Sequence, residues 1–187
     1  MLTARHSSLV LIPIFVIMKK LVAIIIVIAF SLSCSSGKKA HSTQTINWLT
    51  VSQVQEKMKT NPKKVLIDFH TEWCGWCKKM SKHTFTNPRV VNYINENFYA
   101  VKFDAESKET LNFLGKTFSN KKRTHDFALN QGSNNGRISF PTIVYYNENF
   151  EKIKVVPGYY NHQSYLDLIK YFGDDHYKKS SFDKYFQ

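Results

Sequence analysis

The sequence has 187 residues, 43% of them hydrophobic and 14% aromatic, and this size and composition fit one folded domain. The composition excludes collagen, low-complexity disorder and a coiled coil, and three cysteines are too few for a disulfide-stapled scaffold or a four-cysteine zinc ribbon. The net charge of +12, from 26 Lys and Arg against 14 Asp and Glu, leaves nucleic acid and anionic membranes open as partners.

The N-terminal segment has the features of an export signal. An apolar stretch from Leu9 to Leu32 is divided by Met18-Lys19-Lys20, and its second part runs only from Leu21 to Leu32. A membrane-spanning helix needs about 20 apolar residues, whereas the core of a signal peptide needs about 7–15. We therefore interpret residues 1–33 as a signal peptide, with Met18 as an alternative start.

Cys34 follows this segment in the order Ser31-Leu32-Ser33-Cys34, which resembles the cleavage site of bacterial lipoproteins, although Ser31 replaces the usual Leu. The resemblance implies that Cys34 becomes the lipidated first residue and that residues 34–45 form a polar tether. Ordinary cleavage and secretion, or an uncleaved membrane anchor, would fit the same residues. In all three cases the domain, residues 46–187, is exported, and we expect it on the periplasmic side of a bacterial membrane, anchored by lipid.

Basic residues are scattered along the chain rather than gathered in one stretch. Pairs such as Lys38-Lys39, Lys63-Lys64, Lys121-Lys122 and Lys178-Lys179 lie far apart in the sequence. Such scatter is typical of a solvated surface. An exported protein also meets little nucleic acid, so we predict no nucleic-acid partner.

The sequence of the first half of the domain predicts helices and strands in alternation. Helical spacing of apolar residues, short apolar runs and one Asn-Pro pair give the boundaries. The predicted elements are a helix over Thr50–Lys59, a strand over Val65–Phe69, a helix over Cys74–His83, a helix from Asn87-Pro88 to Asn97, and a strand over Phe98–Asp104.

The second half begins with a predicted small hairpin and ends in a helix and a tail. The predicted elements are a hairpin over Thr110–Ser119 turning near Gly115, a short helix over His125–Asn130, strands over Thr142–Tyr146 and Glu151–Val156, and a helix over Ser164–Phe172. The aromatic residues of the tail, residues 173–187, predict that it packs back onto the domain. The order of elements predicts an α/β fold with a central mixed β-sheet flanked by helices.

The segment Trp73-Cys74-Gly75-Trp76-Cys77 lies at a predicted strand-to-helix junction. At a helix N-terminus, free N–H groups and the macrodipole favour the thiolate of Cys74, and the thiolate is the form that attacks a disulfide. Cys77 lies nearly one turn further on the same face, so it can close a disulfide with Cys74 or release a substrate bound to it. Two alternatives are inert buried thiols and half of a metal site, for which His70 is the only nearby ligand. We favour the redox pair and predict no metal.

Two segments resemble the thioredoxin family. Asp-Phe-His-Thr-Glu-Trp-Cys-Gly-Trp-Cys-Lys, residues 68–78, is similar to the active-site segment of that family, and Gly-Arg-Ile-Ser-Phe-Pro-Thr, residues 136–142, is similar to its cis-proline segment. The resemblance covers about residues 65–104 and 136–172, in the family's order. It implies a thioredoxin fold with an insertion, about residues 106–135, before the cis-proline strand. A closer likeness is to exported thioredoxin-like proteins that are joined to, or fed by, membrane electron-conducting reductases.

The resemblance implies roles for residues around the cysteine pair. Cys74 would be the attacking cysteine, Cys77 the resolving cysteine, and the two would form the redox disulfide Cys74–Cys77. Asp68 matches the buried carboxylate behind the resolving cysteine, where desolvation raises its pKa and suits it to exchange a proton with Cys77. Lys102 matches the family's lysine near that carboxylate, although a surface lysine would fit as well.

The resemblance also implies a substrate-binding rim. Pro141 would follow a cis peptide bond and face the cysteine pair, so that Phe140 offers backbone hydrogen bonds to an extended substrate. Trp73, Gly75 and Trp76 would line the rim around the cysteines. The alternatives are a trans proline on an edge strand and ordinary packing of the two tryptophans.

Three features depart from the family pattern. Gly75-Trp76 replaces the usual Gly-Pro between the cysteines, so a redox potential cannot be carried over. His70 replaces a common aromatic residue, and it would either bias the Cys74 thiolate or simply pack. The insertion would either shape the choice of partner or be decorative.

The sequence therefore predicts an exported enzyme, a thiol–disulfide oxidoreductase that reduces protein disulfides through Cys74 and Cys77 and needs no cofactor. The implied partners are proteins with disulfides, a membrane thiol reductase as electron donor, and the membrane through Cys34. The alternatives are a disulfide oxidase or isomerase, a non-redox module that binds extended peptides, and a metal carrier.

Overall fold

The computed structural model describes residues 44–187, so the predicted signal peptide and the predicted lipidation site lie outside the described residues. Its elements are β1 (Trp48–Leu49), α2 (Val51–Thr60), β2 (Lys64–His70), α3 (Gly75–His83), α4 (Pro88–Asn97), β3 (Phe98–Asp104), β4 (Leu111–Phe113), β5 (Lys116–Phe118), α5 (Asp126–Gly132), β6 (Thr142–Tyr146), β7 (Lys152–Pro157), α6 (His162–Gly173), the 3₁₀ turn η1 (His176–Lys178) and α7 (Phe182–Tyr185). Within residues 44–187, no helix combines the length and the apolar character needed to cross a membrane.

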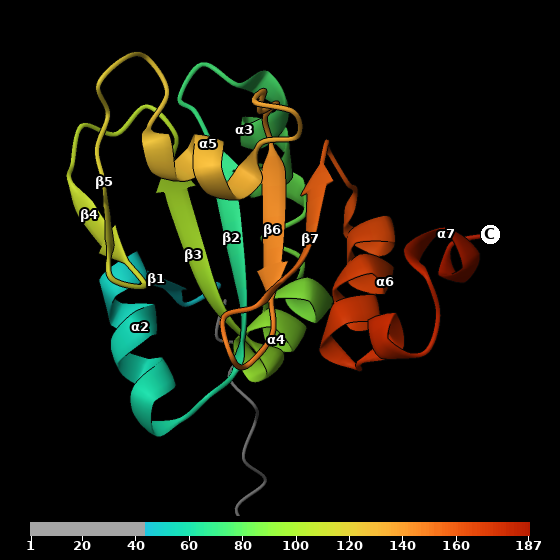
Figure 1. Cartoon of the computed structure of the whole chain (residues 1–187). Coiled ribbons are helices and arrows are strands. Elements are labelled where there is room, and N and C mark those ends of the chain that lie inside the picture. Colours follow the sequence, from blue (N-terminus) through green and yellow to red (C-terminus); the bar gives the residue numbers. More distant parts are fainter. Residues whose placement is uncertain (1–43) are drawn as a thin grey trace, which may run out of the picture. The chain divides into compact units, whose positions relative to one another are not determined.

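The core of the fold is a five-stranded sheet in the order β1-β3-β2-β6-β7 (Figure 1). Strands β1, β3 and β2 run parallel, and β6 and β7 run antiparallel to their neighbours. The mixed sheet is therefore confirmed. Strand β2 lies at its centre, and residues 64–69 are buried on both faces, which explains the continuous apolar run in the sequence.

Each face of the sheet carries its own hydrophobic core. Successive side chains of a strand point to opposite faces, so Leu66 of β2 packs with α3, α4 and α6. Val65 and Ile67 pack instead with α2, the β4–β5 hairpin and α5. Helices therefore flank both faces, as predicted.

Side-chain caps explain where the helices begin. Thr50 caps α2 in a capping box with Gln53, and Asn87 caps α4 with Pro88 in the first turn, the second as the Asn-Pro pair predicts. Helix α6 begins at His162, two residues before the predicted start, because the Asn161 side chain accepts the N–H groups that follow it. Strand β1 is not among the predicted elements, since two residues are too few to establish a strand period.

The β4–β5 hairpin is part of the core. Phe113 and Phe118 are buried, and their rings lie 5.2 and 5.5 Å from the ring of Phe127 on α5. Gln55 on α2 donates to the carbonyl of Asn112 and accepts from the N–H of Leu114. The predicted insertion is therefore built into the second core and is not a loose loop.

The C-terminal tail packs onto α6, as its aromatic residues predict. Tyr171 of α6 contacts the rings of Phe182, Tyr185 and Phe186 at 4.8–5.6 Å. Asp175 also pairs with the nearly buried Lys64 of β2 at 3.1 Å. The tail thus joins the end of the chain to the central strand.

Candidate functional site

The cysteine pair lies at the end of β2, where the chain turns into α3. Cys74 is the N-cap of α3, and its Sγ accepts the N–H of Cys77 at 3.1 Å. Cys74 and Cys77 form a disulfide, and each residue is only 5% exposed. The helix N-terminus therefore points at the sulfur of Cys74, where it stabilises negative charge.

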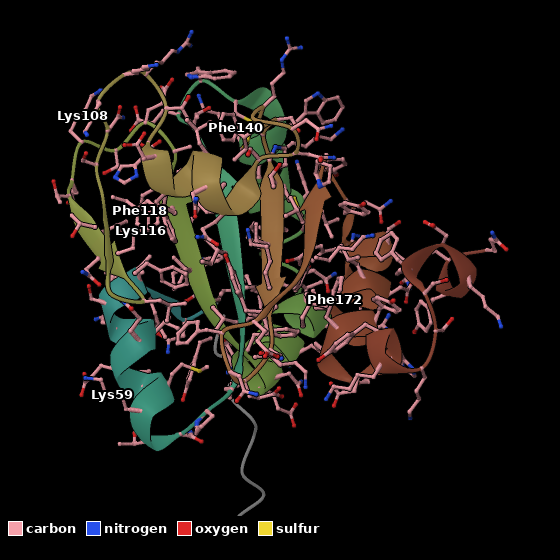
Figure 2. All side chains as sticks on the ribbon, viewed as in Figure 1. Lys59, Lys108, Lys116, Phe118, Phe140 and Phe172 are labelled. Carbon is pink, nitrogen blue, oxygen red and sulfur yellow. A yellow bond between two sulfur atoms is a disulfide. The ribbon has the colours of Figure 1, made fainter. Side chains whose placement is uncertain are left out.

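The cis-proline segment reaches the same end of the sheet. The Phe140–Pro141 peptide bond is cis, as the resemblance implied. Figure 2 labels Phe140 near the start of α3, and the rings of Phe140 and Trp73 meet edge to face at 6.0 Å. Thr142 Oγ1 donates to the carbonyl of Ser139 at 2.6 Å, which holds the turn.

The backbone of Phe140 is free to bind another chain. Within residues 44–187, its N–H and its C=O have no hydrogen-bond partner, although Pro141 beside it accepts the N–H of Gly158 at 2.8 Å. An extended segment of a substrate can therefore pair with Phe140 as one strand pairs with another.

Two tryptophans form an exposed rim beside the disulfide. Trp73 and Trp76 are 58% and 56% exposed, so neither is an ordinary packing residue. Gly75 lies between them, and no atom lies within 4 Å of the position its Cβ would occupy. Large apolar side chains at this place would bind flexible segments of a protein.

The rim also contains residues that sequence reasoning missed. The ring of Tyr159 lies 5.2 Å from that of Trp76, and the Nζ atom of Lys79 lies 4.9 Å from the Trp76 ring centroid. Their sequence signals were weak, because Lys79 belongs to a scattered lysine pair and Tyr159 follows β7, far from the cysteines.

Asp68 lies buried beneath α3. It is 2% exposed, and its Oδ1 atom has no hydrogen-bond partner among the described residues. It shares a sheet face with Leu66, the face that α3 covers, and its neighbour on β3 is Lys102. Burial raises the pKa of Asp68 to about 7, although the charge of Lys102 acts in the opposite direction. A carboxyl group with this pKa can take up or release a proton near neutral pH.

A cavity of about 420 Å³ connects the surroundings of Cys77 with solvent. Its lining includes His70, Cys77, Ser81 and Lys102. Lys102 donates to Ser81 Oγ at 2.7 Å, a contact that the sequence did not predict. His70 and Cys77 line this cavity together, whereas Cys74 is not among its lining residues.

His70 is half-buried, and burial, together with the charge of Lys102, lowers the pKa of its imidazole. This shift favours the neutral form of the imidazole. Among the described residues, no three His, Cys, Asp or Glu side chains are grouped so that they would hold a metal ion.

Comparison with known structures supports the fold. The chain superposes on a structure titled DsbH oxidoreductase with a TM-score of 0.52 and 15% identity, covering 71% of this chain and 87% of that one. It superposes on a putative disulphide-isomerase from Bacteroides thetaiotaomicron with a TM-score of 0.51 and 23% identity, covering 69% and 93%.

A relative by sequence is the thiol:disulfide interchange protein DsbD of Actinobacillus pleuropneumoniae, which is 29% identical over 95 residues. The match covers 43% of this chain but only 16% of that longer protein. The family model for the thioredoxin-like domain matches residues 51–173, most of the described structure. With its mixed sheet, its Cys74–Cys77 disulfide and this match, the chain belongs to the thioredoxin-like domain family.

Proposed function

We propose that this protein is an exported thiol–disulfide oxidoreductase that reduces disulfides in other proteins. The observation that carries the proposal is the disulfide between Cys74 and Cys77 at the N-terminus of α3, beside the cis-Pro141 segment. Binding alone would need neither sulfur, so this pair favours an enzyme over a peptide-binding module.

The cycle begins with the reduced protein. The thiolate of Cys74 attacks one sulfur of a substrate disulfide, and the substrate S–S bond breaks as a mixed disulfide forms. The second substrate sulfur leaves as a thiolate and takes a proton from solvent. Phe140 and the tryptophan rim hold the substrate segment during this step.

Cys77 completes the reaction. It passes its proton to Asp68, directly or through water, and attacks the sulfur of Cys74. The bond between Cys74 and the substrate breaks, and the substrate leaves with two electrons while the Cys74–Cys77 disulfide forms. Two electrons from a membrane thiol reductase then restore the dithiol.

Two further observations support the partners and the location. The relative in Actinobacillus pleuropneumoniae is named a thiol:disulfide interchange protein, which fits exchange with another dithiol. Residues 1–33 have the pattern of an export signal, and Cys34 has that of a lipid-anchored first residue. We therefore infer a lipid-anchored protein on the periplasmic side of a bacterial membrane.

A pair of cysteine variants tests the mechanism. With the purified, reduced protein, we expect Cys74→Ser to abolish the reduction of insulin disulfides, because no attacking sulfur remains. We expect Cys77→Ser to accumulate a mixed disulfide on Cys74, which mass spectrometry under non-reducing conditions detects. Insulin reduction by Cys74→Ser at the wild-type rate would contradict the proposal.

The direction of electron flow requires a separate measurement. A reduction potential near that of thioredoxin, about −270 mV, favours a reductant, whereas one near that of DsbA, about −120 mV, favours the alternative of an oxidase or isomerase. The Gly75-Trp76 pair between the cysteines makes this measurement decisive, because the family's usual value does not transfer.

A further inference from the structure

The insertion reaches the substrate-binding rim. A cavity of about 300 Å³ is lined by Trp73 and Phe140 together with Glu106, Arg123 and Thr124 from the insertion. Because Phe140 has a free backbone and Trp73 adjoins Cys74, a segment that binds at the cysteines and pairs with Phe140 lies beside this cavity. The insertion can therefore contact the residues that flank a substrate cysteine.

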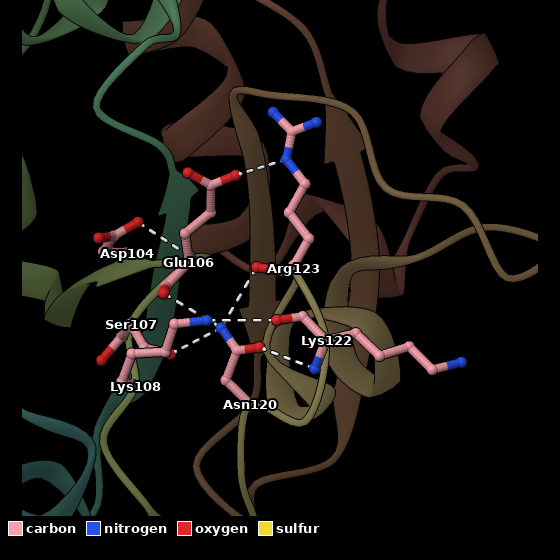
Figure 3. Close-up of polar contacts among 7 residues, drawn as sticks. All are labelled: Asp104, Glu106, Ser107, Lys108, Asn120, Lys122 and Arg123. Carbon is pink, nitrogen blue, oxygen red and sulfur yellow. Dashed lines mark hydrogen bonds and ion pairs between the residues drawn. The ribbon is translucent and has the colours of Figure 1, made fainter.

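Arg123 is the most exposed charged group of this cavity, and two contacts orient it. Its Nε donates to Glu106 Oε1 at 3.0 Å, and its guanidinium lies 5.5 Å from the centroid of the Trp73 ring. Figure 3 shows the two terminal nitrogens pointing away from Glu106, and within residues 44–187 neither has a hydrogen-bond partner. The Arg123 side chain is 78% exposed, so a fork of N–H donors is directed to solvent beside the rim.

The backbone around Arg123 is fixed by Asn120 (Figure 3). The side-chain nitrogen of Asn120 donates to the carbonyls of Glu106, Ser107 and Arg123 at 2.9–3.2 Å, and the side-chain oxygen of Asn120 accepts the N–H of Lys122. One amide thus joins the two segments that carry Glu106 and Arg123. The guanidinium is consequently attached to a defined backbone and not to a free loop.

Glu106 is a positioning residue in this arrangement. Hydrogen bonding by the Trp73 side chain and by Arg123 lowers the pKa of the Glu106 carboxyl, so its charge persists below neutral pH. That charge holds the Nε edge of Arg123 and leaves the other edge open. An arginine has five donors in a planar fork, so it can bind a second carboxylate at the edge that Glu106 does not occupy.

We propose that Arg123 and the cavity beside Trp73 form a subsite that binds a carboxylate side chain of the substrate, close in sequence to the cysteine that reacts. The proposal rests on the proposed function and specifies its substrates: proteins whose reactive cysteine lies in an acidic segment.

The charge of the insertion supports this choice of ligand. Between residues 106 and 124 the chain carries more cations than anions: Lys108, Lys116, Lys121, Lys122 and Arg123 against Glu106 and Glu109. Lys108 also donates to the carbonyl of Lys122, so two of these cations lie on the segments that Asn120 joins. The positive charge of the insertion would strengthen the binding of an acidic segment, and it would repel a basic segment.

The experiment compares peptides that differ at one position near each cysteine, occupied by Glu, Gln or Lys. Affinity for the oxidised protein is measured with Cys→Ser forms of the peptides by fluorescence anisotropy. The rate of reduction is measured with the corresponding disulfide forms and the reduced protein. For wild type we expect about tenfold tighter binding of the Glu peptide than of the Gln peptide, and a lower affinity for the Lys peptide.

Charge reversal makes the test specific. We expect Arg123→Ala to remove most of the preference for Glu, and Arg123→Glu to reverse it in favour of Lys. Arg89→Ala, on α4 away from the cavity, is the matched control and should keep the wild-type preference. Because the guanidinium is exposed, raising the salt concentration should weaken the preference.

The two readouts separate the two proposals. Equal affinities for the three peptides, or an unchanged preference in Arg123→Glu, would overturn the subsite even if all peptides were reduced. A clear preference for Glu in binding, with no reduction of any disulfide peptide, would support the subsite and overturn the proposed function.

Discussion

At the scale of single residues, the most unusual group is the carboxyl of Asp68. A buried carboxylate with an oxygen that lacks a hydrogen bond destabilises a fold, and Leu66, which shares the sheet face of Asp68, belongs to a hydrophobic core. The placement is understandable if the proton of Asp68 is used in the resolving step beneath α3. The destabilisation caused by the buried carboxyl group should then make the free energy of unfolding depend on pH.

The sign of that dependence follows from the pKa of Asp68, which rises from 3.8 in the unfolded chain to about 7 in the fold. Between these values the folded protein holds a proton that the unfolded chain releases, so the free energy of unfolding falls as pH rises from about 4 to 7. The total loss is about 4 kcal/mol. We expect Asp68→Asn to remove this slope and to be more stable than wild type at pH 8.

Urea denaturation of the oxidised protein at pH 5 and pH 8 measures the effect. Asp167→Asn, on the exposed face of α6, is the control and should keep the wild-type slope. A slope that persists in Asp68→Asn would show that another group causes it. The reduced variant should also release substrate from the mixed disulfide more slowly, since Cys77 loses its proton acceptor.

At the scale of elements, local signals in the sequence predict the helices and strands well. Caps such as Asn87 and apolar runs such as residues 65–69 are properties of neighbouring residues, and the corresponding elements agree with the structure to within one or two residues. The cysteine pair was accessible from its place at a predicted strand-to-helix junction, whereas the cis-proline was expected from the resemblance of residues 136–142 to a family segment. The contacts of Arg123 were not, because Trp73 lies about 50 residues earlier and only the fold brings them together.

The β4–β5 hairpin provides the prediction at this scale. Phe113 is 4% exposed and contacts rings of α5 and β6, so we expect Phe113→Ala to lower the free energy of unfolding by about 3–5 kcal/mol. Leu114→Ala, at the exposed tip of the hairpin, should change it by less than about 0.5 kcal/mol. Denaturation of both variants provides the comparison. Similar, small effects would mean that the hairpin is an accessory flap rather than part of the core.

At the scale of the whole molecule, composition predicts one domain, and the order of elements predicts the mixed sheet. The sequence does not indicate how closely the insertion approaches the cysteine pair, because its contacts depend on the register of β2 against β3 and β6. The proposed lipid anchor, by contrast, concerns the segment before residue 44, which lies outside the described residues.

The proposed anchor can be tested by cell fractionation. We expect the wild-type protein to be membrane-bound and to incorporate labelled fatty acid, and Cys34→Ser to lose the label and leave the membrane fraction, since the proposed acylation site is gone. Cys74→Ser is the control and should remain membrane-bound. A Cys34→Ser protein that stays with the membrane would indicate an uncleaved anchor, and a wild-type protein found free of membranes would indicate plain secretion.

The two edges of the sheet have a consequence for the proposed action on other proteins. Strand β1 is only two residues long, while β7 presents exposed Lys152 and Lys154 and ends in Pro157, which has no N–H to donate. Short strands, lysines and proline all oppose edge-to-edge pairing. Both edges of the five-stranded sheet are therefore poor templates for pairing with another chain, so a segment that binds at the ends of the strands, as we propose, would not be drawn into the sheet.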